Sequence, residues 1–170
     1  MKKSFLPNLF TFTNLGFGIM SLLMNFRGNY KMSCLFIIFA ALVDRYDGKV
    51  ARMLNVSSDL GKQLDSLSDL VSFGVAPSLL VYNMYNLSRL GILGYALLLL
   101  FPICGSYRLA KFNSMEFAGF FLGIPITAAG CIIALLGLLT LNSRDNFLLP
   151  IILLSILSYL MISNIKIKKV

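Results

Sequence analysis

Apolar residues fill six long stretches of this chain, and short polar or charged segments separate the stretches. Each stretch is about 20 residues or longer, which is roughly the length of α-helix that crosses the ~30 Å hydrocarbon core of a bilayer. The pattern therefore predicts six helices. Their expected limits are residues 5–26, 31–54, 59–86, 90–111, 117–141 and 146–165.

The composition favours a membrane protein over a soluble one. Of the 170 residues, 58% are hydrophobic and only 13% are charged, whereas a soluble domain is usually about half apolar and about a quarter charged. Six spans would occupy nearly the whole length. We therefore expect an all-α integral membrane protein with six transmembrane helices, formed by a single domain over residues 1–170.

The net charge of +8 raises the question of a nucleic-acid partner. The basic residues instead lie beside the ends of apolar stretches, which is typical of membrane topology, so no nucleic-acid partner is expected. Lysines flank the first and last stretches, and an even number of spans places both termini on one side. Six further basic residues fall on that side: Arg45, Lys49, Arg52, Lys62, Arg108 and Lys111. The opposite loops hold only Arg27, Lys31, Arg89 and Arg144. This bias predicts cytoplasmic termini and a multi-pass protein of the cell membrane, with its first helix retained.

Two residue types limit the chemistry. The chain has no histidine, so imidazole ligands and histidine-based proton transfer are excluded. Its three cysteines are widely spaced within or beside apolar stretches, which suggests neither a disulfide framework nor a zinc site. Gly119 and Gly123 form a small-xxx-small pair that could bring two helices close together.

Four aspartates interrupt the second and third apolar stretches: Asp44, Asp47, Asp65 and Asp69. A carboxylate in the middle of a bilayer costs roughly 2.5 to 3.5 kcal/mol, so four of them need compensation. They recur at three- and four-residue steps, which places each pair on one helix face. A short connection would bring the two faces together.

Clustered carboxylates without soft ligands suit hard divalent ions such as Mg²⁺ or Mn²⁺, and two such ions can support phosphoryl transfer. Nearby residues of small volume would allow a ligand to approach, and one arginine could bind phosphate oxygens. These are Gly48, Ala51, Gly61 and Arg52. The alternative is that each aspartate faces water at a helix end or pairs with a neighbouring Lys or Arg.

The full pattern, D-x2-D-G-x2-A-R-x8-G-x3-D-x3-D, resembles the signature of the CDP-alcohol phosphatidyltransferases. Every signature position is occupied here, by Asp44, Asp47, Gly48, Ala51, Arg52, Gly61, Asp65 and Asp69. Within that family, the flanking segments are similar to the small bacterial phosphatidylserine synthases. These segments are residues 7–8, 13–15, 64–78, 104–105, 108–113 and 123–125. Residues 124–127 depart from the pattern, because those synthases usually carry a second proline there, and we expect this segment to lie away from the aspartates.

The resemblance implies transfer of the phosphatidyl group of CDP-diacylglycerol to L-serine, giving phosphatidylserine and CMP. It implies two divalent ions, Mg²⁺ or Mn²⁺, bound by Asp44, Asp47, Asp65 and Asp69, with Asp69 also acting as general base near the cytoplasmic face. Gly48, Ala51, Arg52 and Gly61 would line the CDP pocket. It also suggests a homodimer surrounded by membrane lipids.

Serine carries a carboxylate, so its site should include a cation. Candidates are Arg108 and Lys111, with Asn113 as a polar neighbour, although both cations could equally be membrane-topology anchors. Asn8 and Asn14 could contact the nucleotide or bond between helices.

Other functions stay open at this point. The acceptor could be glycerol 3-phosphate or inositol 1-phosphate, or the donor an archaeal lipid. A more distant alternative is a divalent-cation transporter, although Arg52 would repel its cargo.

Overall fold

The computed structural model describes the backbone of most of the chain. The described residues are 5–53, 59–114, 120–143, 146–163 and 166–168. Side chains are described over residues 8–46, 59–114, 123–143 and 146–163.

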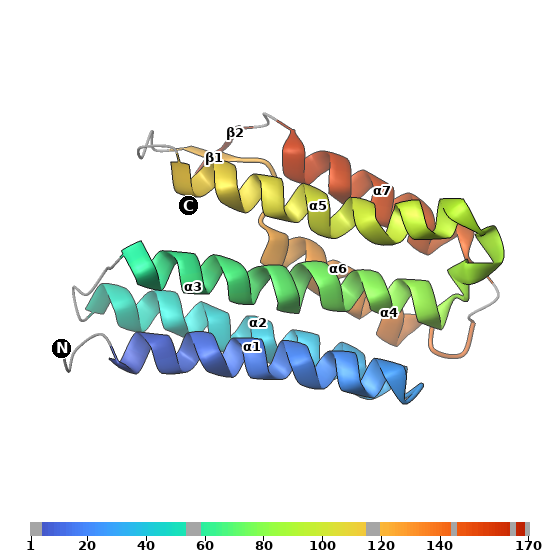
Figure 1. The fold of residues 1–170 in the computed structure, drawn as a ribbon, viewed down its shortest axis with the longest axis horizontal. Coiled ribbons are helices and arrows are strands. Elements are labelled where there is room, and N and C mark those ends of the chain that lie inside the picture. The colour runs from blue at the N-terminus through green and yellow to red at the C-terminus, as the bar shows by residue number, and fades with distance from the viewer. Residues whose placement is uncertain (1–4, 54–58, 115–119, 144–145, 164–165, 169–170) are drawn as a thin grey trace.

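Helices dominate the described residues (Figure 1). The α-helices are α1 (Phe5–Phe26), α2 (Tyr30–Met53), α3 (Asp59–Asp69), α4 (Ala76–Met84), α5 (Ile92–Ser114), α6 (Ile126–Leu139) and α7 (Leu148–Ile162). Two shorter helices are the π-helix η1 (Leu70–Val75) and the 3₁₀ helix η2 (Leu87–Leu90), and two short strands are β1 (Phe120–Leu122) and β2 (Lys166–Lys168). Helices α3, η1 and α4 follow one another without a break, so the described helices form six rods, as the apolar pattern predicts.

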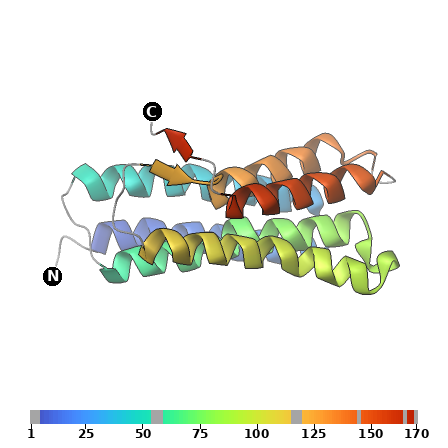
Figure 2. The same ribbon diagram turned by 90° about the horizontal axis from the view of Figure 1, so that it is seen from above.

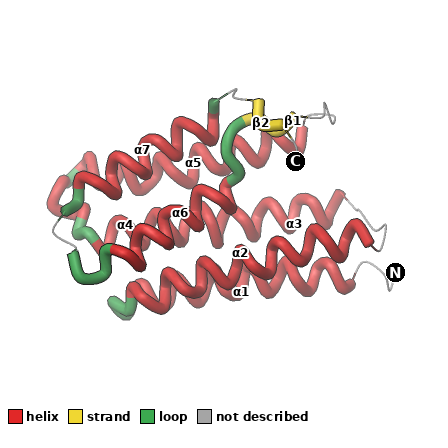
Figure 3. Tube along the Cα trace, turned by 180° about the vertical axis from the view of Figure 1, so that it is seen from behind, coloured by secondary structure: helices red, strands yellow, loops and turns green. Residues whose placement is uncertain are grey.

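The rods lie in two layers (Figure 2). One layer holds α1, the α3–α4 rod and α5, and the other holds α2, α6 and α7. Helix α6 lies between α2 and α7, as the view from behind shows (Figure 3). Helices α1 and α2 pack along most of their length, and η1 contacts α1, α2, α5 and α6. The segment that follows Asp69 is therefore enclosed by four other helices.

Three described helical stretches are long and apolar enough to cross a membrane: Asn8–Phe26, Asp59–Met84 and Ile92–Ser114. Helices α6 and α7 are apolar but shorter, with 14 and 15 residues. At 1.5 Å per residue they are only about 21 and 22 Å long. The fold is that expected of an integral membrane protein.

The predicted start of the fifth helix is wrong. Residues 120–122 form strand β1, which pairs antiparallel with β2, and α6 begins only at Ile126. Gly123 adopts the left-handed φ of 69°, and Pro125 is extended with ψ of 139°, so neither continues a helix. The short β-pair is also a local exception to the expected all-α fold, since the sixth helix ends at Ile162 and the chain then pairs with β1.

The proposed helix contact through Gly119 and Gly123 is also wrong for Gly123, because this residue lies in the turn before α6. Gly119 lies outside the described residues. A Cβ atom on Gly123 would lie 2.6 Å from the carbonyl oxygen of Met161 and 2.7 Å from that of Leu160. This glycine therefore lets the turn pass the end of α7.

Close packing also joins α6 to the π-helix. A Cβ atom on Gly130 would lie 2.8 Å from the carbonyl oxygen of Phe73 and 2.9 Å from its Cα. Phe73 itself is fully buried. Only a residue without a side chain allows the two backbones to approach this closely, so Gly130 sets the position of η1 directly after Asp69.

Candidate metal centre and active site

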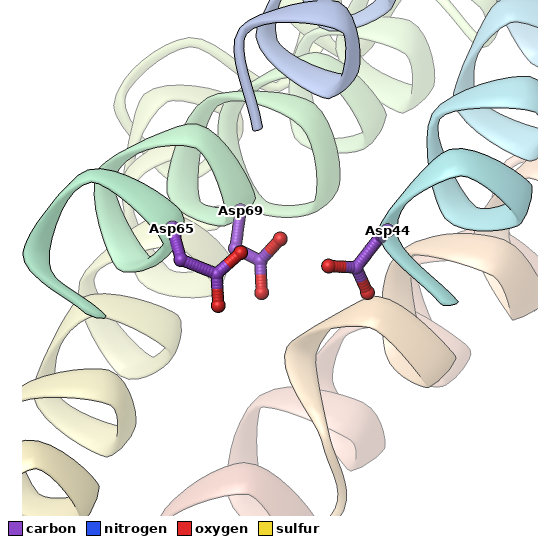
Figure 4. A group of neighbouring side chains, drawn as sticks. All are labelled: Asp44, Asp65 and Asp69. Atoms are coloured by element: carbon purple, nitrogen blue, oxygen red, sulfur yellow. The ribbon is translucent and has the colours of Figure 1, made fainter. Parts of the chain in front are cut away.

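Three of the four sequence-predicted aspartates converge between α2 and α3. One carboxylate oxygen from each of Asp44, Asp65 and Asp69 lies within 4.8 Å of the others. Figure 4 shows Asp65 and Asp69 projecting from α3 towards Asp44 on α2. Asp69 is only 8% exposed, and the other two are half-buried.

The antiparallel arrangement of α2 and α3 explains this convergence. Asp44 lies nine residues before the end of α2, and Asp69 lies ten residues after the start of α3. At 1.5 Å per residue, these positions are about 14 and 15 Å from their helix ends. They therefore meet at the same level along the two helices. Asp65 shares their side of the bundle because it lies one turn before Asp69.

The three negative charges repel one another strongly. Two unit charges 4.8 Å apart interact by roughly 3.5 kcal/mol at an effective dielectric constant of about 20. With three such pairs, the cluster needs positive charge. Oxygen ligands at this spacing fit a hard divalent cation, and the chain has no histidine to offer a softer site.

Helix α1 contributes a hydrogen bond to the cluster. Asn14 is 1% exposed, and its Nδ2 donates to Oδ1 of Asp69 over 3.0 Å. The hydroxyl of Ser72 in turn donates to the backbone carbonyl oxygen of Asn14 over 3.0 Å. These bonds fix α1 against the π-helix and hold the Asp69 carboxylate in one orientation.

Helix α5 contributes a positive charge. Arg108 lies close enough to Asp69 for their charges to interact, and Asp69 also interacts with Asp44 and Asp65. The Nε of Arg108 is buried and has no hydrogen-bond partner among the described residues. Arg108 by itself carries one positive charge, against three carboxylates.

Comparisons with known proteins agree with this geometry. A family profile described as CDP-alcohol phosphatidyltransferase matches residues 4–163. The chain belongs to the CDP-alcohol phosphatidyltransferase family.

Three curated relatives are named CDP-diacylglycerol–serine O-phosphatidyltransferase. The protein from Helicobacter pylori strain 26695 is 38% identical over 172 residues, covering 94% of this chain and 70% of the relative. The Bacillus subtilis protein is 39% identical and covers 96% of this chain and 89% of its own length. The Methanocaldococcus jannaschii protein is 38% identical, with 94% and 71% covered.

For several residues of the phosphatidyltransferase signature, the structure describes the backbone but not the side chain. Asp47, Gly48, Ala51 and Arg52 belong to the helical backbone of α2, but their side chains lie outside the described residues. Gly61 is described and lies in the first turn of α3, half-buried. The roles of these residues therefore rest on the signature itself.

The three candidates for serine binding lie on the last turns of α5. Arg108 and Lys111 are both half-buried, and the charge of Arg108 interacts with that of Asp69. Asn113 instead donates from Nδ2 to the hydroxyl of Ser66 on α3 over 2.9 Å. That bond joins the two helices beside the acidic cluster, so Asn113 has a structural role whether or not it also contacts a substrate.

The expectation that residues 124–127 lie away from the aspartates is wrong. The hydroxyl of Thr127 lies 3.4 Å from Oδ2 of Asp44 and donates to it. Because the turn at Gly123 delays the start of α6, the first turn of that helix comes up against α2. Thr127 was missed because nothing local in the sequence links it to Asp44, 83 residues away.

The sequence did offer a signal for Asn14, because a buried amide in an apolar helix requires a partner. Residue pattern alone left two partners open, a nucleotide or another helix. The structure places its amide nitrogen on Asp69. The π-helix after Asp69 had no sequence signal, although such segments often occur at functional sites.

Proposed function

We propose that this protein transfers the phosphatidyl group of CDP-diacylglycerol to the hydroxyl of L-serine, giving phosphatidylserine and CMP. The observation that carries the proposal is the convergence of Asp44, Asp65 and Asp69 in a chain of this family. The choice of serine rests on the names of relatives that are 38–39% identical over most of the chain.

The metal centre consists of Asp44, Asp47, Asp65 and Asp69. Two divalent cations held there, Mg²⁺ or Mn²⁺, would offset the charge of the diphosphate and of the departing CMP. The spacing of the three described carboxylates supports this assignment. Thr127 orients Asp44 and Asn14 orients Asp69, so two of the ligands are held by hydrogen bonds from other helices.

Asp69 is the general base. The serine hydroxyl oxygen attacks the phosphorus that bears diacylglycerol, and the bond from that phosphorus to the bridging oxygen of CMP breaks. Asp69 takes the hydroxyl proton as the new bond forms. Its deep burial and its fixed orientation support this role, because a base must lie within hydrogen-bond reach of the proton that it removes.

The CDP pocket is formed by Gly48, Ala51, Arg52 and Gly61. Small residues on α2 and α3 leave room for the nucleotide, and a guanidinium group can bind two phosphate oxygens at once. This part of the proposal is supported by the family signature.

The serine site uses the end of α5. Arg108 binds the serine carboxylate, with Lys111 and Asn113 nearby. The support is the electrostatic interaction of Arg108 with Asp69, together with a buried Nε that has no partner among the described residues.

The membrane setting follows from the helices and from the charge bias. We propose six spans in the cytoplasmic membrane, both termini inside and the acidic cluster near the cytoplasmic face. The acyl chains of the donor then stay in the leaflet while its diphosphate reaches the aspartates. A homodimer is proposed by resemblance to the family.

The test is CMP release by purified protein in detergent micelles that contain CDP-diacylglycerol and Mn²⁺ or Mg²⁺. Serine, glycerol 3-phosphate and inositol 1-phosphate are offered separately, alongside the Asp69→Asn variant. We expect release with serine only, and a loss of about 100-fold or more in the variant. Release with another alcohol would keep the family chemistry and overturn the acceptor. Metal transport into liposomes without any CMP release would overturn the proposal altogether.

A further inference from the structure

Three buried side-chain atoms have no hydrogen-bond partner among the described residues: Oδ1 of Asn14 on α1, Nδ2 of Asn25 on the same helix, and Nε of Arg108 on α5. Two of them, Oδ1 of Asn14 and Nε of Arg108, belong to residues that interact with Asp69. The first can only accept a hydrogen bond, and the second can only donate one. Buried polar atoms without partners are unfavourable, so a pair of opposite polarity beside one carboxylate indicates a ligand that carries both a donor and an acceptor.

The amide of Asn14 is directed at the site. Its Nδ2 already donates to Asp69, and its backbone is held by Ser72, so its Oδ1 is confined to the immediate neighbourhood of that carboxylate. The Asn14 side chain is almost completely buried, with an exposure of 1%. A group that binds this oxygen would therefore also lie within reach of Asp69.

Arg108 lies on α5, and its charge interacts with that of Asp69. No described hydrogen bond satisfies its buried Nε. An anionic group between α5 and Asp69 would provide the missing acceptor.

Serine matches this arrangement because its three polar groups are attached to two adjacent carbons and include both a hydrogen-bond donor and an acceptor beside the reacting hydroxyl. The hydroxyl is the group that must reach Asp69. The ammonium group is a donor, and the carboxylate is an acceptor.

We infer that Asn14 is a substrate-binding residue whose Oδ1 accepts a hydrogen bond from the serine ammonium group, while Nε of Arg108 donates to the serine carboxylate. The inference rests on the proposed function and adds the residue that selects an amino acid over other alcohols. Asn14 thereby links the orientation of the base to the presence of the correct acceptor.

The test combines variants with acceptors that lack one group. L-Serine is compared with 3-hydroxypropionate, which lacks the ammonium group, and with ethanolamine, which lacks the carboxylate. Each is measured by kcat/KM for CMP release where it reacts, and otherwise by its inhibition constant against serine. In variants too slow for kinetics, displacement of radiolabelled serine from protein bound to CDP-diacylglycerol gives ratios of dissociation constants, which are compared with those of the wild type.

Asn14→Leu has a side chain of similar volume but no acceptor. We expect its preference for serine over 3-hydroxypropionate to fall about tenfold or more, while its preference for serine over ethanolamine stays within about threefold of the wild type. Asn14→Asp keeps an oxygen acceptor, so it should retain the first preference even if its turnover is lower. Arg108→Gln should lose the second preference and keep the first.

The matched control is Asn25→Leu. Asn25 lies on the same helix, is 2% exposed and also bonds to a residue of the α3–α4 rod, Asn83, but far from the aspartates. It should change stability and leave both preferences unaltered.

An equal loss with all three acceptors in Asn14→Leu would overturn the inference, since it would show that Asn14 acts only on Asp69. A wild-type protein that binds serine and 3-hydroxypropionate equally well would overturn it too. A wild-type protein without serine-dependent CMP release would instead overturn the proposed function, and this is measured before any variant is compared.

Discussion

Replacing Asp69 by asparagine should stabilise the metal-free protein while it abolishes activity. The substitution removes one negative charge from a cluster in which carboxylate oxygens lie within 4.8 Å of one another. It preserves the local geometry, because the asparagine side-chain oxygen can still accept the hydrogen bond from Asn14. The change therefore acts mainly on electrostatics and on metal binding.

The expected gain follows from two repulsive pairs. Each pair contributes roughly 3.5 kcal/mol at an effective dielectric constant of about 20, but solvent screens the half-buried Asp44 and Asp65. The attraction of Arg108 for Asp69 is lost as well. We expect a net gain of about 2 kcal/mol, which corresponds to a rise of about 4–8 °C in Tm for a chain of this length.

Thermal unfolding can be followed by a thiol-reactive fluorescent dye. The chain has no tryptophan, but Cys34 and Cys104 are buried and become reactive when the helices separate. Wild type and variant are compared in detergent with EDTA and then with increasing Mn²⁺. The wild type should gain stability with Mn²⁺, because a ligand that binds only the folded state stabilises it. The variant should gain much less.

Asp59→Asn is the matched control. Asp59 is an exposed carboxylate in the first turn of α3, outside the cluster. Its loss should lower stability slightly, because an acidic group is favourable at a helix N-terminus, and should leave the effect of Mn²⁺ unchanged. If Asp69→Asn lowers Tm in EDTA, or if Mn²⁺ stabilises it as much as the wild type, the electrostatic reasoning is refuted.

Three further predictions concern packing, ligand orientation and metal dependence. Gly130→Ala should destabilise the protein by about 1–3 kcal/mol, because the added Cβ meets the backbone of Phe73. Gly16→Ala on α1 is the control: its added Cβ would have no neighbouring atom within 4 Å, so it should not lower Tm. Equal Tm values for the two variants would contradict this packing. Thr127→Val should raise the Mn²⁺ concentration for half-maximal activity about two- to fivefold, because Asp44 loses a long hydrogen bond. An unchanged metal titration would show that this bond does not orient Asp44 for metal binding. Removal of divalent ions with EDTA should abolish CMP release and added Mn²⁺ should restore it; activity that survives chelation would rule out the metal centre.

The apolar pattern predicted the helical rods well because membrane spans are long and continuous. The first expected span, residues 5–26, coincides with α1, and the second differs from α2 by a single residue at each end. The failure lies at residues 120–125, where an apolar run looked like part of a helix. A local glycine and proline, and a partner strand more than 40 residues away, decided otherwise.

The grouping of the three described aspartates was predictable from the sequence, and their surroundings only partly. Regular spacing on two neighbouring helices was enough to bring Asp44, Asp65 and Asp69 together, since an antiparallel helix pair fixes their relative level. The contacts from Asn14 and Thr127 depend on how α1 and α6 pack against that pair, which no local spacing encodes.

The sequence by itself determined that the chain forms apolar helices, that its carboxylates gather on two of them, and that hard cations suit those carboxylates. These properties depend on residue type and helical period, which are local. Only the tertiary structure decided that Asn14 on α1 binds Asp69, that Thr127 on α6 reaches Asp44, and that buried polar atoms of Asn14 and Arg108 have no partner among the described residues. Those contacts join residues far apart in the chain, so they arise only when the helices pack.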